Sequence, residues 1–194
     1  MYTLETDRLV MRPFCDSDVD FLNYLHSDLD VTRYTLGRTR SHNENIDYVK
    51  TMLTLHDQGI GHLVVIRKSD SSPIGRCGYS YFYGVNDGEM DWFYWGDPKK
   101  VTRDGKIFKL LELGYTYAKP AWGHGFATEA ALAFQEFGYT QLGYDGFSSL
   151  VIKENIGSIN VARKMGAYKV VECMTHDTPS FDLRNKNSGN GNNG

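Results

Sequence analysis

The chain has 194 residues, 41% of them hydrophobic and 23% charged, which fits one globular domain, assigned here to residues 1–184, with a sizeable core. A net charge of −3 argues against a nucleic-acid partner, and the lack of a long apolar run argues against a membrane one. The three cysteines are scattered and the six histidines lack ligand spacing, so we expect no disulfide framework, no metal site and a reduced, cytoplasmic setting.

The first third of the chain predicts one strand and two helices. Arg8 to Phe14 alternates in part between apolar and polar residues, as a strand does. Asp16 to His26 has apolar residues at helical spacing, with Asp16 or Ser17 as the expected cap. A second helix is expected to begin near Ser41, because Ser41 and Glu44 have the spacing of a capping box.

The middle of the chain changes to the period of strands. His62 to Arg67 is rich in β-branched residues, and Ile74 to Tyr83 is its expected hairpin partner. Residues 84–106 are polar and Gly-rich around the aromatic run Trp92 to Trp95, which indicates an insertion or an extended hairpin. Phe108 to Tyr117 predicts a further strand.

The last third alternates helices and strands before a polar end. The expected elements are a helix over Ala127 to Tyr139, a strand over Phe147 to Ile152, a helix over Ile156 to Met165 and a strand over Tyr168 to Met174. The whole order, β-α-α-β-β-β-α-β-α-β, predicts an α/β (α+β) fold. Residues 185–194 are rich in Asn, Gly and Ser and are expected to form a disordered tail.

A glycine loop precedes the third predicted helix. Gly123 and Gly125 follow a turn at Lys119-Pro120, and the free N–H groups and dipole of the helix start favour an anion such as a pyrophosphate. By itself the loop is better explained by an ordinary strand-to-helix turn. It does not have the third glycine of a dinucleotide fold or the Gly-Lys-Ser/Thr ending of a P-loop.

A second segment, from Lys153 to Tyr168, also follows a strand and opens a helix. Taken alone, Asn155 is compatible with a helix cap and Ser158 with a polar residue of the first helical turn. The combination of this segment with the glycine loop is more specific than either of them.

With both segments, the sequence resembles the GNAT superfamily of N-acetyltransferases, and within it the ribosomal-protein N-terminal acetyltransferases of the RimJ/RimL type. The matching text is Leu9-Val-Met-Arg-Pro-Phe, Glu112-Leu-Gly-Tyr, Trp122-Gly-His-Gly-Phe-Ala-Thr-Glu-Ala, Asn155-Ile-Gly-Ser and Lys164-Met-Gly-Ala. The resemblance covers roughly residues 3–175, with gaps at the aromatic run. It implies a mixed, splayed central sheet flanked by helices, with acetyl-CoA between the fourth and fifth strands.

The resemblance also implies roles for single residues. The cofactor-binding residues would be Tyr115, Thr116 and Tyr117 along the pantetheine arm, Gly123, His124, Gly125, Phe126, Ala127 and Thr128 around the pyrophosphate, and Asn155. Ser158 would lie near the sulfur as the acid. The superfamily often has Arg or Gln where Trp122 stands, although this branch tolerates Trp. Some branches have a proton-donating tyrosine where this chain has Ala162, which favours Ser158 or water as the acid.

Acetyl transfer to an amine also needs a group that accepts a proton from the amine. Glu112 is the first choice, because it precedes the expected acetyl site on the same strand; a solvated strand-edge carboxylate is the plain alternative. Glu89 and Asp91 are weaker candidates. The aromatic residues Trp92 to Trp95 would form either an acceptor wall or part of the core.

The sequence thus predicts an enzyme that moves an acetyl group from acetyl-CoA to a primary amine, either a protein N-terminus or a small molecule, by direct attack on the thioester. Its partners would be acetyl-CoA and the amine acceptor, and the protein would be a monomer or homodimer. A catalytically inactive CoA-binding sensor or scaffold would share the same loop. A general nucleotide-binding domain would prefer ATP or NAD to CoA.

Overall fold

The computed structural model describes residues 2–96 and 98–187, which divide into two compact units. The first unit contains residues up to 78 and residues 115–134; the described residues from 79 to 114 and from 135 onward form the second. The chain passes between the units within strand β4 (Ser72–Asn86), strand β6 (Ile107–Tyr117) and helix α4 (Phe126–Thr140). Strands β4 and β6 also pair with each other.

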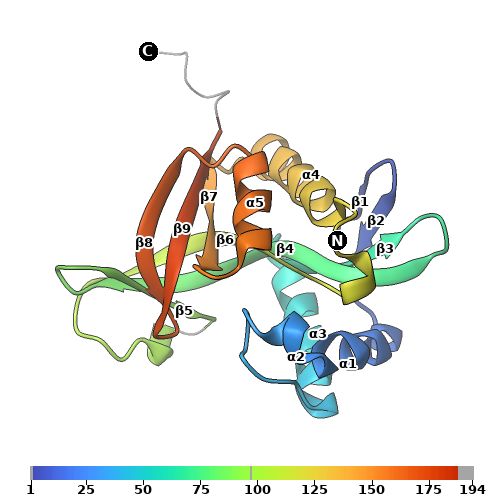
Figure 1. Cartoon of the computed structure of the whole chain (residues 1–194), viewed down its shortest axis with the longest axis horizontal. Helices are drawn as coiled ribbons and strands as arrows, with labels where there is room; N and C mark the ends of the chain where they lie inside the picture. Colours follow the sequence, from blue (N-terminus) through green and yellow to red (C-terminus); the bar gives the residue numbers. More distant parts are fainter. Residues whose placement is uncertain (1, 97, 188–194) are drawn as a thin grey trace. The chain divides into compact units, whose positions relative to one another are not determined.

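The first unit combines antiparallel strands with three complete helices and the first part of α4. Its strands follow the order β1 (Leu4–Glu5), β2 (Leu9–Arg12), β3 (Gly61–Arg67) and β4. Its helices are α1 (Val19–Ser27), α2 (Leu29–Thr32) and α3 (His42–Asp57), and α3 packs against both β3 and α1 (Figure 1). The core includes Leu9, Met11, Leu22, Met52 and Leu63, so the β-branched run predicted as a buried strand is one.

Helix α3 begins as the sequence predicts. The Ser41 hydroxyl accepts a hydrogen bond from Glu44 N at 3.3 Å, and the Glu44 carboxylate accepts one from Ser41 N at 2.8 Å. This reciprocal pair is a capping box, which satisfies two backbone donors at the helix start. Gly59 follows the helix end with a φ of +80°, a conformation that favours glycine.

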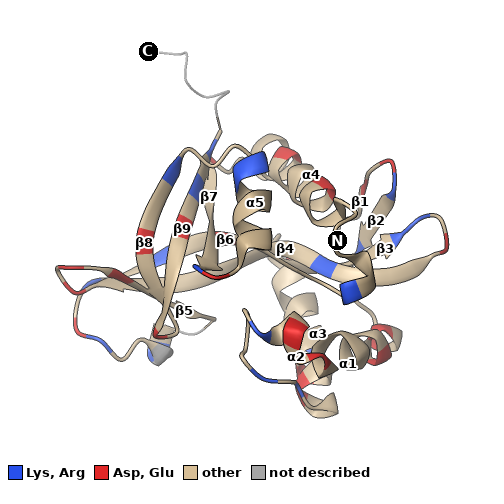
Figure 2. Ribbon diagram, viewed as in Figure 1, with Lys and Arg blue, Asp and Glu red and all other residues tan. Residues whose placement is uncertain are grey.

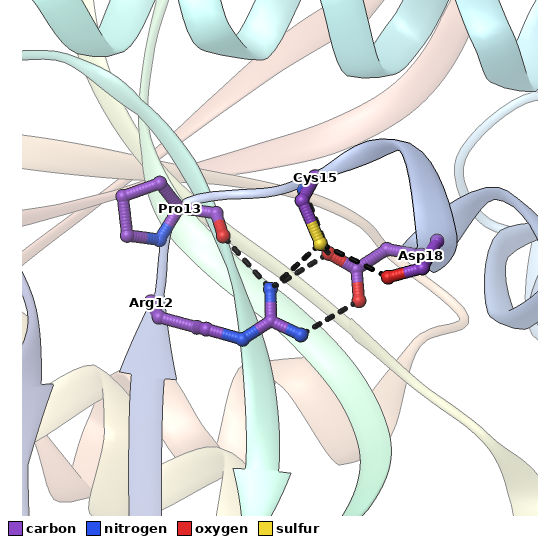
Figure 3. Close-up of polar contacts among 5 residues, drawn as sticks. Arg12, Pro13, Cys15 and Asp18 are labelled. Atoms are coloured by element: carbon purple, nitrogen blue, oxygen red, sulfur yellow. Dashed lines mark hydrogen bonds and ion pairs between the residues drawn. The ribbon is translucent and has the colours of Figure 1, made fainter.

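The predicted helix from Asp16 to His26 is divided, and neither Asp16 nor Ser17 caps it. Residues Asp16–Asp18 form a short 3-10 turn, and α1 begins after it. The Asp18 carboxylate accepts from Cys15 N at 2.8 Å and from both terminal nitrogens of Arg12 at 2.7 and 2.9 Å (Figure 3). The predicted cap was therefore wrong. The backbone N–H of Cys15 at the start of the turn is bound by the Asp18 carboxylate, which Arg12 of β2 holds in place.

The second unit is built on a mixed sheet, as predicted. Its strand order is β4, β5 (Asp91–Trp95), β8 (Lys169–Thr175), β9 (Thr178–Lys186), β7 (Gly146–Ile152) and β6. The pairs β5–β8 and β6–β7 are parallel, whereas β4–β5, β8–β9 and β7–β9 are antiparallel. Helix α5 (Ile156–Lys164) lies against β7 and β9, where Val151, Ile159, Ala162 and Leu183 form a buried cluster (Figure 1).

The sequence analysis missed three elements, β1, α2 and β9, and left a fourth open. Strand β1 and helix α2 were missed because they are short. The segment left open, residues 84–106, contains β5, which forms a hairpin with β4. Strand β9 was missed because several of its buried positions are polar, namely Ser180, Asp182 and Asn185.

The expected polar tail does not begin at residue 185, because β9 continues to Lys186. Asn185 is buried in β9 and donates a hydrogen bond to Met165 O at 2.9 Å, and Lys186 ends the strand. The rest of the predicted tail, residues 188–194, lies outside the described residues. Among the residues that the structure does describe, no helix has the length and apolar character needed to cross a bilayer.

Candidate functional site

The end of β6 leads into the glycine loop. The Tyr117 carbonyl accepts a hydrogen bond from the indole Nε1 of the exposed Trp122 at 2.7 Å. Trp122 thereby ties the loop back to the strand, which gives the side chain at this position a structural role. One lone pair of the Tyr117 carbonyl is therefore occupied, which limits what this residue can offer a pantetheine arm. Thr116 is buried, and Tyr115 is half-buried.

The loop itself places two glycines with positive φ directly before a helix start. Gly123 and Gly125 have φ angles of +76° and +81°, and a Cβ on Gly123 would meet no heavy atom within 4 Å. Glycine is thus favoured at 123 by conformation and not by crowding. The Gly125 carbonyl accepts the first helical hydrogen bond, from Glu129 N at 3.0 Å. The N–H groups of Phe126, Ala127 and Thr128 consequently have no acceptor within the helix.

A cation from the N-terminal strand region lies beside this loop. Arg8 donates a hydrogen bond from Nη1 to His124 O at 3.0 Å, and its guanidinium lies 4.6 Å from the centre of the Phe126 ring. Arg8 also forms an ion pair with Glu129, which accepts a further hydrogen bond from the Thr6 hydroxyl. Sequence reasoning missed Arg8, because no local pattern links it to a loop 116 residues away.

Glu129 is ionised in this arrangement. Burial acts to raise the pKa of its carboxyl, but hydrogen bonds from Thr6 and Arg8 outweigh that effect, and the pKa is lowered. Because Glu129 balances the charge of Arg8, attraction of an anion to the loop depends chiefly on the backbone N–H groups and the helix dipole. Basic and acidic residues are interspersed along the strands and helices (Figure 2).

The first-choice base, Glu112, is buried and not a solvated edge residue. Its side chain is 8% exposed, and Oε2 accepts a hydrogen bond from the Ser80 hydroxyl at 2.9 Å. Glu112 lies opposite Ser148 in the parallel pairing of β6 with β7. A Cβ added to Gly114 would lie 2.9 Å from both carboxylate oxygens, so Glu112 and Gly114 share one face of the strand, as predicted.

The weaker candidates for the base have other surroundings. Glu89 is exposed in the turn between β4 and β5. Asp91 accepts a hydrogen bond from Asn86 Nδ2 at 2.8 Å and lies 3.9 Å from Arg184 Nη2. The Asp91 carboxylate is thus engaged by the hairpin and its neighbouring strand, and the assignment of either residue as the base stays a prediction.

The aromatic run belongs partly to the core. Phe93 is completely buried against Phe108, with ring centres 5.8 Å apart, and Tyr94 is also buried. Trp92 is half-buried, donates to Asp87 Oδ2 at 2.6 Å and lies under the Arg103 guanidinium. An acceptor wall formed by this run would therefore be limited to Trp92 and Trp95, the other half-buried member.

Asn155 caps helix α5. Its Oδ1 accepts a hydrogen bond from Ser158 N at 3.1 Å, and both residues are half-buried. The capping interpretation is confirmed, whereas contacts of Asn155 with a cofactor and proton donation by Ser158 stay predictions. Ala162 is fully buried in the cluster under α5, so this position faces the core.

The predicted site residues fall into both units. Tyr115 to Thr128 belong to the first unit, whereas Glu112, Asn155 and Ser158 belong to the second. The residues of the first unit include backbone N–H donors at the start of α4. The residues of the second unit include the buried carboxylate of Glu112 and the hydroxyl of Ser158 in the first turn of α5. No group of three or more His, Cys, Asp or Glu residues is placed to hold a metal within residues 2–96 and 98–187.

Comparisons with known proteins show the family and the fold of the chain. The family model described as the acetyltransferase (GNAT) domain matches residues 8–168. The chain is similar to the uncharacterized N-acetyltransferase p20 of Bacillus licheniformis, with 27% identity over 172 residues that cover 87% of this chain and 84% of that one. In fold it is similar to an acetyltransferase from Agrobacterium tumefaciens, with 20% identity, a TM-score of 0.69 and coverage of 96% and 95% of the two chains. It is likewise similar in fold to the ribosomal L7/L12 acetyltransferase RimL, with 14% identity, a TM-score of 0.70 and coverage of 95% and 98%.

Proposed function

The chain belongs to the GNAT acetyltransferase family, and from this premise we propose that it transfers the acetyl group of acetyl-CoA to a primary amine. The observation that carries the proposal is the loop from Gly123 to Gly125, whose two left-handed glycines lead into the open N–H groups at the start of α4. The backbone N–H groups and dipole of such a helix start can bind a diphosphate group without a cluster of Lys and Arg side chains. The acceptor would be a protein N-terminus or a small-molecule amine.

The reaction needs two proton movements besides the new bond. The amine nitrogen attacks the thioester carbonyl carbon, the C–S bond breaks, and an amide and the free thiol of CoA result. In our proposal Glu112 accepts the proton that the amine loses, directly or through water. Ser158 donates a proton or a hydrogen bond to the departing sulfur.

Burial of Glu112 supports its assignment as the base. A buried carboxylate is held in one position by Ser80 and is shielded from water, so it would meet an amine in a defined orientation. A carboxylate on an exposed turn, such as Glu89, has neither property.

A thiol-release assay tests the proposed function. Acetyl-CoA would be incubated with the protein and, separately, with peptides that have a free N-terminus, aminoglycosides, polyamines and amino acids. We expect CoA release with at least one class above the rate without an amine. Tight CoA binding by calorimetry without release for any class would indicate the inactive sensor or scaffold instead. Preferential binding of ATP or NAD would indicate a general nucleotide-binding domain.

A further inference from the structure

Two guanidinium groups of the first unit lie over the same aromatic ring and have no carboxylate partner in the described structure. Arg76 on β4 is 6% exposed, and Arg40, between α2 and α3, is half-buried. Both lie over the ring of Tyr48, with Cζ 5.2 and 4.6 Å from its centre. In the described part of the chain, no Asp or Glu is within ion-pair distance of either arginine.

The acidic residue that acts electrostatically on Arg40 is already occupied. Glu44 is bound by both terminal nitrogens of Arg38 and by the backbone of Ser41. The pKa of Arg40 is lowered to about 10, first by burial and then by the charge of Arg76. The two cations therefore repel each other and remain uncompensated, and Arg40 keeps its charge at neutral pH.

Two unused polar atoms that accompany these cations are hydrogen-bond donors, whereas the unused His26 Nε2 is an acceptor because the proton of that imidazole lies on Nδ1, facing Asn45 Oδ1. Arg76 donates from Nη1 to His62 Nδ1 at 2.6 Å, so the proton of that imidazole lies on Nε2. Both His62 Nε2 and Arg76 Nε are buried without a partner among the described residues.

The neighbouring histidines add no charge. Burial, then Arg76 and Arg40, hold the pKa of His62 well below its ordinary value. Burial lowers the pKa of His26 to about 3, with Arg76 contributing, and its Nδ1 meets Asn45 Oδ1 at 2.7 Å. Both imidazoles are neutral, and the positive charge of the cluster belongs to Arg40 and Arg76.

A buried cation without a counter-charge is costly, and the planar guanidinium fork matches the oxygens of carboxylates and phosphates. We propose that Arg40 and Arg76 bind an anionic group, a carboxylate or a phosphate monoester, carried by the amine acceptor. This inference rests on the proposed function, because the phosphates of acetyl-CoA are assigned there to the glycine loop. The acceptor is then the other substrate that can bring an anion.

Anion binding can be tested without any reaction. Thermal unfolding would be measured with inorganic phosphate and with chloride at equal ionic strength, for the wild type, Arg76→Gln, Arg40→Gln and the control Arg33→Gln. Arg33 is exposed over the Tyr34 ring, so its substitution removes the same charge from the surface. We expect phosphate to raise the Tm of the wild type and Arg33→Gln, and to do so much less in the other two variants. An equal rise in all four proteins would overturn the proposed site.

The source of the anion is tested with matched acceptors, an amino acid and its amide. The ratio of their kcat/KM values should fall roughly 10- to 100-fold in Arg76→Gln relative to the wild type, and should be unchanged in Arg33→Gln. Comparing ratios between variants cancels the different basicity of the two amines. If no amine is acetylated while phosphate still stabilises, the proposed function fails and the anion site stands. An unchanged ratio in Arg76→Gln would show that the acceptor does not supply the anion.

Discussion

The Ser80 hydroxyl donates a hydrogen bond to Oε2 of Glu112 at 2.9 Å, and the two residues are 1% and 8% exposed. A buried carboxylate in this position is either a structural anchor of the strand pair or a reactive group, and substitution separates the two.

Glu112→Gln keeps the shape of the side chain and removes its basicity. If Glu112 is the base, kcat/KM should fall by roughly 10²- to 10⁴-fold, and the acid limb of the pH–rate profile should disappear. Ser80→Ala should move that limb to higher pH, because a hydrogen bond donated to a carboxylate stabilises its ionised form. Steady-state kinetics across pH provide the measurement.

The matched control for this substitution is Glu136→Gln, which changes an exposed position of α4 and should leave the kinetics unaltered. Full activity with an unchanged profile in Glu112→Gln would move the search for the base to Glu89 and Asp91. A profile that follows only the pKa of the amine would indicate that no protein base is needed.

Gly123→Ala tests the loop as a diphosphate cradle. The φ of +76° should cost roughly 1 kcal/mol of unfolding free energy, as should Gly37→Ala at +66°, where the added Cβ also meets open space. We expect only Gly123→Ala to weaken acetyl-CoA binding in calorimetry. Gly125→Asp should weaken it further, since it adds a negative charge at the helix start. Unchanged affinity in both loop variants would remove the cradle from the proposal.

Substitution can separate the capping role of the Asn155 side-chain oxygen from a role of its amide NH2 group in cofactor binding. Asn155→Asp keeps an oxygen for Ser158 N and should retain stability, whereas Asn155→Ala should lose about 1 kcal/mol. If the amide contacts the cofactor, both variants should raise the KM for acetyl-CoA. Chemical denaturation and kinetics on the same samples separate these effects, and a normal KM in Asn155→Asp would leave Asn155 as a cap alone.

Ser158→Ala should lower kcat with little change in the KM for acetyl-CoA, because a group that assists the departing sulfur acts mainly in the transition state. The backbone N–H of residue 158 can still donate its hydrogen bond to Asn155 Oδ1, so the helix cap should survive and the free energy of unfolding should change little. Intact kcat combined with weaker cofactor binding would make Ser158 a binding residue.

Arg12→Met should destabilise the protein by about 3 kcal/mol, because it leaves the buried Asp18 carboxylate without its cation. Arg67→Met, which breaks the exposed pair with Asp70, should cost less than about 1 kcal/mol. Equal losses in the two variants, measured by urea unfolding at pH 7, would contradict this account.

The same pair predicts a pH dependence. Burial acts to raise the pKa of Asp18, but hydrogen bonds from Arg12 and Cys15 lower it below its ordinary value. The stabilisation is therefore complete above the unfolded pKa of about 3.9 and is lost as pH falls through the lower folded value. The difference in stability between the wild type and Arg12→Met should narrow below about pH 4.

Local features could be predicted from the sequence alone. The Ser41–Glu44 capping box and the glycine loop before α4 depend on residues within a few positions of one another. Their hydrogen bonds and backbone angles are set by neighbours in the chain, so spacing and residue type are sufficient evidence. The family resemblance rests on two such local segments, and the family was identified correctly from them.

Features made by distant residues required the tertiary structure. Arg8 reaches a loop 116 residues away, Ser80 meets Glu112 across 32 positions, and β9 is buried in spite of its polar sequence. The uncompensated pair of Arg40 and Arg76 belongs to the same class, because each arginine alone reads as an ordinary surface residue. Burial and charge pairing depend on which distant side chains share a volume, and only the folded chain determines that.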